Sequence, residues 1–303
     1  MDASPLRTTP MTAPPTVPSN PFLACFPDPE PLHRFDWAAH GVEVPYVIFF
    51  TGCCGSTHLI HLLHDTGLCG RPYELFNESR VASWVKSLNV TNLESYFEAI
   101  VGKYVQQGRW GFKIDPTRLG YLADSITFTE VFPVASTQFF WMTRRDILSQ
   151  AWSYATAVKS GVWHIFADGG VVPATSKEAI TVTDLDWWRQ IFAIVRAEAT
   201  METFFAKNGI VPIRIDYEGL VADRNAVLIA VLSHLGCSPS EIEHSLPKVE
   251  NRTVRLPYDA KYQRLTTFMQ TYPTAIAHIL SQRTALDASW LRQELKQTYG
   301  ITL

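Results

Sequence analysis

A short segment rich in glycine, hydroxyl and thiol side chains follows the first strongly apolar run of the chain. Its residues are Thr51, Gly52, Cys53, Cys54, Gly55, Ser56 and Thr57. The apolar run predicts a buried strand and the residues after it predict a helix, so backbone N–H groups and the positive helix end converge on a point that suits an anion. Glycine allows close approach of the backbone, and the hydroxyls of Ser56 and Thr57 can cap the helix or donate to phosphate oxygens. We interpret residues 52–57 as a candidate phosphate-binding loop, with a tight turn that binds nothing as the alternative.

The loop lacks the signatures of two other phosphate loops. No lysine precedes Ser56 and Thr57, so the segment is not the Walker A loop of ATP-hydrolysing proteins and kinases. Neither Cys53 nor Cys54 is followed by the arginine that a tyrosine-phosphatase loop requires, so nucleophilic thiol chemistry lacks its partner. A P-loop kinase stays open as an alternative function, and it would consume ATP and depend on magnesium.

Five segments that contain the loop and further polar residues occur in a distinctive order. They are 46–76, 110–113, 144–153, 161–164 and 217–223. In this order they resemble the bacterial trehalose-type sulfotransferases, which take a sulfuryl group from 3′-phosphoadenosine 5′-phosphosulfate (PAPS). The resemblance implies a P-loop-containing nucleotide-hydrolase-like (sulfotransferase) fold, PAPS as the donor, and no metal. It also implies transfer to a hydroxyl or amine of a small-molecule, carbohydrate or lipid acceptor.

The resemblance assigns three residues to the nucleotide in addition to the loop. Arg145 and Ser153 match the pair that holds the 3′-phosphate, and an arginine fork suits phosphate geometry. Tyr217 matches the aromatic residue that contacts adenine. The alternatives are a surface arginine beside an unrelated helical serine, and a tyrosine that belongs to the core.

Three further residues match catalytic or acceptor positions. Glu74 stands at the position of the general base that takes a proton from the acceptor. Lys113 ends a predicted strand at the edge where ligands bind in parallel sheets, and His164 lies in the block near the acceptor pocket. A surface glutamate and a structural histidine are the alternatives for Glu74 and His164.

The loop departs from the family at two positions. Relatives commonly carry arginine where this chain has Cys53, and serine where it has Cys54. A charged hydrogen bond to a phosphate contributes about 1.5–3 kcal/mol, so another cation must compensate, and His58, Lys113 and Arg144 are the candidates. A catalytically impaired nucleotide-binding protein on the same fold is the alternative reading.

Strand and helix patterns alternate along the chain. Strands are predicted at 44–50, 110–114, 138–142 and 211–215, and helices at 55–66, 93–107, 117–126, 146–159, 184–207 and 224–235. Parallel strands need crossover connections, so this alternation predicts an α/β three-layer sandwich with a central, mostly parallel sheet. The segment 238–275 gives no clear pattern.

Composition limits the partners and the cellular location that the sequence predicts. The 303 residues carry a net charge of −3, which argues against general binding to nucleic acid. The odd number of cysteines, five, favours reduced thiols and a cytoplasmic location, and no apolar run is long enough for membrane insertion. Proline-rich residues 1–40 predict a flexible leader before a single sulfotransferase domain at 41–303. Relatives that dimerise weakly favour a homodimer.

Overall fold

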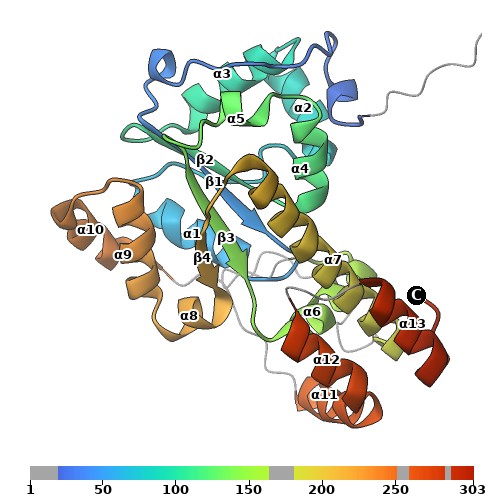
Figure 1. Ribbon diagram of the computed structural model, residues 1–303. Helices are drawn as coiled ribbons and strands as arrows, with labels where there is room; N and C mark the ends of the chain where they lie inside the picture. The colour runs from blue at the N-terminus through green and yellow to red at the C-terminus, as the bar shows by residue number, and fades with distance from the viewer. Residues whose placement is uncertain (1–19, 164–180, 251–258, 284–287) are drawn as a thin grey trace, which may run out of the picture.

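Four parallel strands form the centre of the protein (Figure 1). The computed structural model describes residues 20–163, 181–250, 259–283 and 288–303. In these residues the sheet has the order β2-β1-β3-β4, and neighbouring strands all pair in parallel. The strands are β1 (Val44–Phe50), β2 (Arg109–Ile114), β3 (Gln138–Thr143) and β4 (Ile213–Asp216). Their carboxyl ends share one edge of the sheet.

Helices cover both faces of the sheet, and successive side chains of β1 point into two different cores. Val47 and Phe49 belong to one core, and Tyr46 and Ile48 belong to another. The first core packs against α2 (Glu78–Leu88), α3 (Leu93–Tyr104), α4 (Pro116–Ala123) and α5 (Phe128–Val131), and the second against α1 (Ser56–Thr66), α9 (Arg224–His234) and α10 (Pro239–Ser245). A strand buried on both faces is typical of a parallel sheet between helical layers. The predicted three-layer α/β sandwich is therefore confirmed.

A third core lies at one end of the molecule, where the C-terminal helices pack against α6 and α7 (Figure 1). Its helices are α6 (Ile147–Ser160), α7 (Asp184–Asn208), α11 (Asp259–Thr271), α12 (Pro273–Gln282) and α13 (Ala288–Tyr299). The ring of Trp187 stacks on Phe268 with centroids 4.1 Å apart, which ties α7 to α11. In the described part of the chain, no helix has both the length and the apolarity to cross a membrane.

Several elements differ from the sequence predictions. The fourth strand begins at Ile213 rather than at Val211, because Pro212 has no N–H to donate to the neighbouring strand and Val211 is 91% exposed. Helix α2 was not predicted, and only Val81 and Val85 are buried along it. The unassigned segment after residue 238 forms α10, a short 3₁₀ helix at Leu246–Lys248 and α11.

The second half of the predicted leader packs on the domain. Phe22, Phe26 and Trp37 are buried in the same core as α3, and the indole N–H of Trp37 donates to the carbonyl of Val131 at 2.6 Å. The described residues 20–40 are thus part of the folded domain rather than of a flexible leader, because their aromatic side chains supply core surface. Residues 1–19 lie outside the described residues.

Candidate active site

A cavity of about 990 Å³ opens at the carboxyl ends of the strands, the edge where parallel α/β sheets bind ligands. Residues from the loop after β1, from the ends of β2 and β3, and from α6 and α8 (Tyr217–Ala222) line it. Among the predicted site residues, those that line it are Gly52, Cys53, Gly55, Ser56, Thr57, Glu74, Lys113, Ser153 and Tyr217. The fold thus brings residues from distant segments to one site.

The loop after β1 is shaped by close contacts at its glycines. A Cβ on Gly52 would lie 2.6 Å from Cε1 of Tyr154, and one on Gly55 would lie 2.4 Å from Cδ2 of Tyr217. Gly55 also has a φ of 94° and precedes the first turn of α1, a conformation that glycine adopts without strain. The side chain of Gln150, which sequence reasoning missed, holds the loop by donating to Thr51 Oγ1 at 2.9 Å and to the Gly52 carbonyl at 2.8 Å.

The two loop cysteines have different environments. Cys53 lines the cavity and has a φ of 58°, a left-handed conformation that is uncommon for residues other than glycine. Cys54 is fully buried in the core beneath α1, and burial raises the pKa of its thiol. Its backbone N–H donates to the Thr51 carbonyl at 3.3 Å. The prediction that Cys54 binds the ligand is therefore corrected, because neither its side chain nor its amide faces the cavity.

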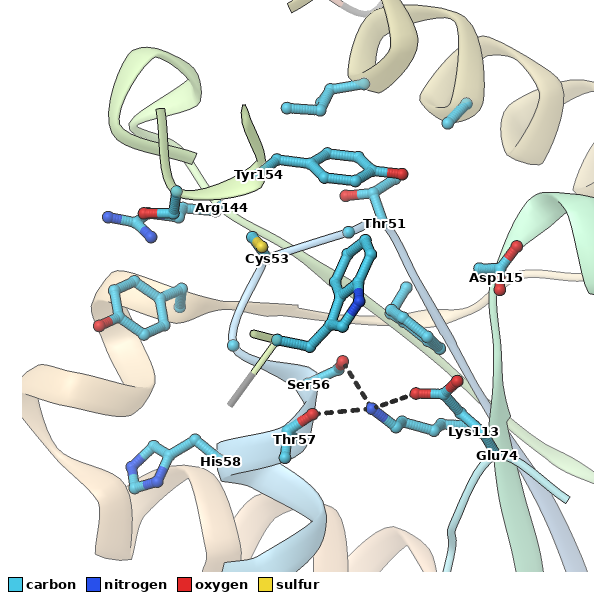
Figure 2. A pocket seen from close by; sticks show the side chains of 18 of the residues that line it. Thr51, Cys53, Ser56, Thr57, His58, Glu74, Lys113, Asp115, Arg144 and Tyr154 are labelled. Atoms are coloured by element: carbon cyan, nitrogen blue, oxygen red, sulfur yellow. Dashed lines mark hydrogen bonds and ion pairs between the residues drawn. The ribbon is translucent and has the colours of Figure 1, made fainter. Parts of the chain in front are cut away.

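Figure 2 shows Lys113 between the hydroxyls of the loop after β1 and the carboxylate of Glu74. Lys113 is 3% exposed, and its Nζ lies 2.9 Å from Oε1 of Glu74. The same ammonium group donates to Thr57 Oγ1 at 2.9 Å and to Ser56 Oγ at 3.3 Å. One buried cation therefore contacts both the candidate phosphate-binding loop and the carboxylate of Glu74, the predicted general base.

The backbone also fixes the position of Glu74 beside β2. The N–H of Lys113 donates to the Tyr73 carbonyl at 3.0 Å, and this hydrogen bond holds the residue before Glu74 next to β2. The second carboxylate oxygen of Glu74 accepts a hydrogen bond from Nδ2 of Asn77 at 3.1 Å. Both oxygens of this carboxylate are thus oriented by neighbours, and the group faces the cavity.

Arg144 is a second cation of the cavity wall. It is 9% exposed, and its guanidinium carbon lies 4.5 Å from the centroid of the Tyr217 ring. Within the described part of the chain, its Nε has no hydrogen-bond partner. A buried guanidinium N–H without a hydrogen-bond partner costs free energy, so this group is suited to bind an anion. Ser153 lines the same cavity.

Arg145 lies outside this arrangement. Its side chain is 71% exposed, with Nε 3.1 Å from Oδ1 of Asp216 and 3.7 Å from Oε2 of Glu218. It is not among the described residues that line the cavity. The structure therefore does not bring Arg145 together with Ser153, as the sequence predicted. The described arginines that line the cavity with Ser153 are Arg80, Arg118, Arg144 and Arg224, and of these Arg144 has a buried Nε without a partner among the described residues.

The rim of the cavity carries further side chains that the sequence did not single out. Arg118 forms an ion pair with Glu78 and Asp115, each at 3.1 Å, and the Tyr154 ring lies 5.8 Å from that of Trp163. The predicted acceptor-site residue His164 lies outside the described residues.

Two observations concern the positive charge around the loop after β1. His58 lines the cavity in the first turn of α1, and burial, reinforced by the positive charge of Arg224, lowers the pKa of its imidazole. Among the residues that the structure describes, no cluster of His, Cys, Asp and Glu is arranged to hold a metal ion. The described cations that line the cavity are Lys113, Arg144 and Arg224, with Arg80 and Arg118.

Comparison with known proteins identifies the family of the chain. No curated protein gave a significant match to the chain. The family model of the Stf0 sulphotransferases matches residues 45–259, a range that begins within β1 and contains the loop, Glu74, Lys113 and Arg144. On this match and on the parallel-sheet fold, the chain belongs to the Stf0 sulphotransferase family and is an enzyme of the sulfotransferase class.

Proposed function

We propose that the protein transfers a sulfuryl group from PAPS to a hydroxyl or amine of a small-molecule, carbohydrate or lipid acceptor. The observation that carries this proposal is the position of Lys113, whose ammonium group contacts both the loop hydroxyls and the carboxylate of Glu74. Sulfuryl transfer creates negative charge on the departing phosphate and releases a proton from the acceptor. A cation beside the loop and a carboxylate next to it meet both requirements.

The donor set of the cavity suits PAPS. The N-terminus of α1, with the hydroxyls of Ser56 and Thr57, offers an anion site for the 5′-phosphosulfate. Arg144, whose buried Nε has no partner among the described residues, and Ser153 offer a second anion site for the 3′-phosphate. Tyr217 lines the wall beside both sites and offers an aromatic face to adenine.

Each chemical task has a residue. PAPS, when bound, supplies the sulfuryl group and a stable phosphate as leaving group. The carboxylate of Glu74 accepts the proton of the acceptor hydroxyl or amine. Lys113 and the amides at the start of α1 stabilise negative charge at the loop, so most of the rate acceleration comes from positioning and charge stabilisation.

Lys113 also answers the question raised by Cys53. Relatives place a cation on the loop at this position, and this chain has a thiol. Because Lys113 reaches Ser56 and Thr57 from the neighbouring strand, we assign to it the charge that the loop itself lacks. This assignment favours an active enzyme over a catalytically impaired nucleotide-binding protein.

The test combines transfer with binding. Radiolabelled sulfate from PAPS is offered with a panel of sugars, lipids and small metabolites, and affinity for adenosine 3′,5′-bisphosphate is measured by calorimetry on the same protein. We expect micromolar binding and transfer to at least one acceptor class, with Glu74→Gln binding normally and transferring slowly. Binding without transfer to any acceptor would favour the impaired nucleotide-binding protein, ATP consumption with magnesium would favour a kinase, and absence of binding would refute the proposal.

A further inference from the structure

The turn between β3 and α6 carries Arg144 and is held by hydrogen bonds from two directions. On one side, the carboxylate of Glu218 accepts from the N–H of Arg145 at 3.0 Å and from the N–H of Asp146 at 3.1 Å. On the other side, Nη1 of Arg283 donates to the carbonyl of Arg145 at 2.8 Å. The backbone next to Arg144 is therefore fixed by residues of α8 and of the end of α12.

The guanidinium of Arg283 is itself held in a single orientation. Its Nε and Nη2 donate to the two carboxylate oxygens of Glu198 at 2.8 Å and 2.6 Å. The side chains of Arg283 and Glu198 are 16% and 6% exposed. A bidentate pair of this kind is strongly directional, so the remaining nitrogen of Arg283 is aimed at the turn.

Glu198 links this contact to the cavity. It lies in α7 beside Ala197, and Ala197 and Ile194 of the same helix line the cavity. The chain of contacts therefore runs from α12 through α7 and the turn to the wall that contains Arg144. Arg283 follows the region matched by the family model, which ends at residue 259, so nothing in that match accounts for its contact.

We infer that Arg283 is a positioning residue of the donor site, which holds the β3–α6 turn so that Arg144 faces the 3′-phosphate of the nucleotide. This inference rests on the proposed function. It implies that the C-terminal helices are a working part of nucleotide binding. The competing explanation is that Arg283 only joins α12 to the domain.

The test compares two nucleotides that differ by the phosphate in question. Affinities for adenosine 3′,5′-bisphosphate and adenosine 5′-monophosphate are measured by calorimetry for the full chain and for Arg283→Gln. The preference is the ratio of the affinity for the bisphosphate to the affinity for the monophosphate. Because Arg283 acts through Arg144, we expect this ratio to be about tenfold smaller in the variant, the effect of losing one charge-assisted hydrogen bond. Affinity for the monophosphate should be nearly unchanged.

Control variants separate positioning from folding. Arg292→Gln changes another arginine of the C-terminal helices, whose guanidinium carbon lies 4.8 Å from the Phe192 ring centroid, and it should leave both affinities unchanged. In an Arg144→Gln background, which itself should lose the preference, Arg283→Gln should cause no further loss. Arg283→Lys keeps the charge beside Glu198 but loses the fork that reaches the turn, so it tests the same contact if the glutamine variant unfolds.

Two results would overturn the inference. One is a folded Arg283 variant that keeps the full preference for the bisphosphate, and the other is an equal loss for both nucleotides, which a purely structural role predicts. Failure of the proposed function looks different, because the unmodified protein would then bind neither nucleotide.

Discussion

Replacement of Lys113 by methionine separates the role of this cation in catalysis from its role in folding. Methionine retains much of the apolar stem but lacks the ammonium group, whose Nζ lies 4.5 Å from the Phe50 ring centroid. The ammonium group and its contacts with Glu74, Thr57 and Ser56 are lost. We expect the rate of transfer to fall about 10²–10³-fold, the effect of removing one donor from a preorganised anion site, about 2.7–4 kcal/mol.

The effect on stability should be smaller than the effect on catalysis. Lys113 is buried, but the side chain of Glu74 is 26% exposed and regains water when its partner is removed. The free energy of unfolding should therefore fall by about 1–3 kcal/mol, less than the roughly 3–5 kcal/mol typical when one partner of a fully buried pair is deleted. Adding Glu74→Gln should restore part of the stability and none of the activity.

Single-turnover transfer and denaturant unfolding of the same preparations provide the measurement. Lys103→Met is the matched control, because Lys103 lies at the end of α3 with Nζ 5.5 Å from the Tyr104 ring centroid and does not line the cavity among the described residues. A Lys113→Met enzyme whose transfer rate stays within about threefold of the original, well below the loss for one such donor, would refute the assignment of charge stabilisation to this lysine.

Three further predictions follow from the loop and its neighbours. Gly55→Ala should abolish measurable bisphosphate binding in calorimetry, because its Cβ would meet Tyr217 at 2.4 Å, whereas Gly102→Ala, with nothing within 4 Å, should bind normally. Gln150→Leu, which breaks the contacts with the loop, should lower the free energy of unfolding by about 1–3 kcal/mol and weaken binding. Burial lowers the pKa of His58 from 6.5, so the unfolded chain binds the proton more readily than the folded protein does. The free energy of unfolding should therefore fall as the pH drops below 6.5, and His58→Asn should reduce this acid sensitivity in unfolding curves.

The layered fold could be predicted because its signals are local. The run Val44–Phe50 is apolar at almost every position, which indicates a strand buried on both faces, and Gly67 ends α1 with the expected left-handed conformation. Helix α2 was not predicted although its sequence carries local signals, since Asn77 caps it and Val81 and Val85 are spaced as on one face of a helix. The family resemblance, rather than periodicity, identified Glu74 on the segment before it.

The two loop cysteines show where residue types alone were insufficient. Cys53 and Cys54 are adjacent and chemically identical, and both were expected to contact the ligand. The left-handed φ of Cys53 turns the chain so that the next side chain enters the core beneath α1. This backbone conformation is usual for glycine, so a cysteine sequence gives no sign of it.

The choice between Arg144 and Arg145 shows a signal that was present and not used. Along β3, Phe139 and Trp141 belong to the core on one face of the sheet, and Phe140 and Met142 belong to the core that contains α1. Successive side chains of a strand point to opposite faces, so continued alternation places Arg144 on the face of Met142, toward Tyr217 and the loop. Arg145 then points to the opposite side.

No comparable signal exists for Arg283. Its contact with the turn joins residues separated by 138 positions, and α12 has no motif that relates it to a nucleotide. The contact arises because α7 packs against both the sheet and the C-terminal helices, which brings Glu198 and Arg283 to the turn. Since the same α7 lines the cavity, a change in the C-terminal helices should alter donor binding before it alters proton transfer at Glu74. Substitutions at Arg283 should therefore raise KM for the donor and leave kcat nearly unchanged. Substitutions at Glu74 should lower kcat and leave KM for the donor nearly unchanged.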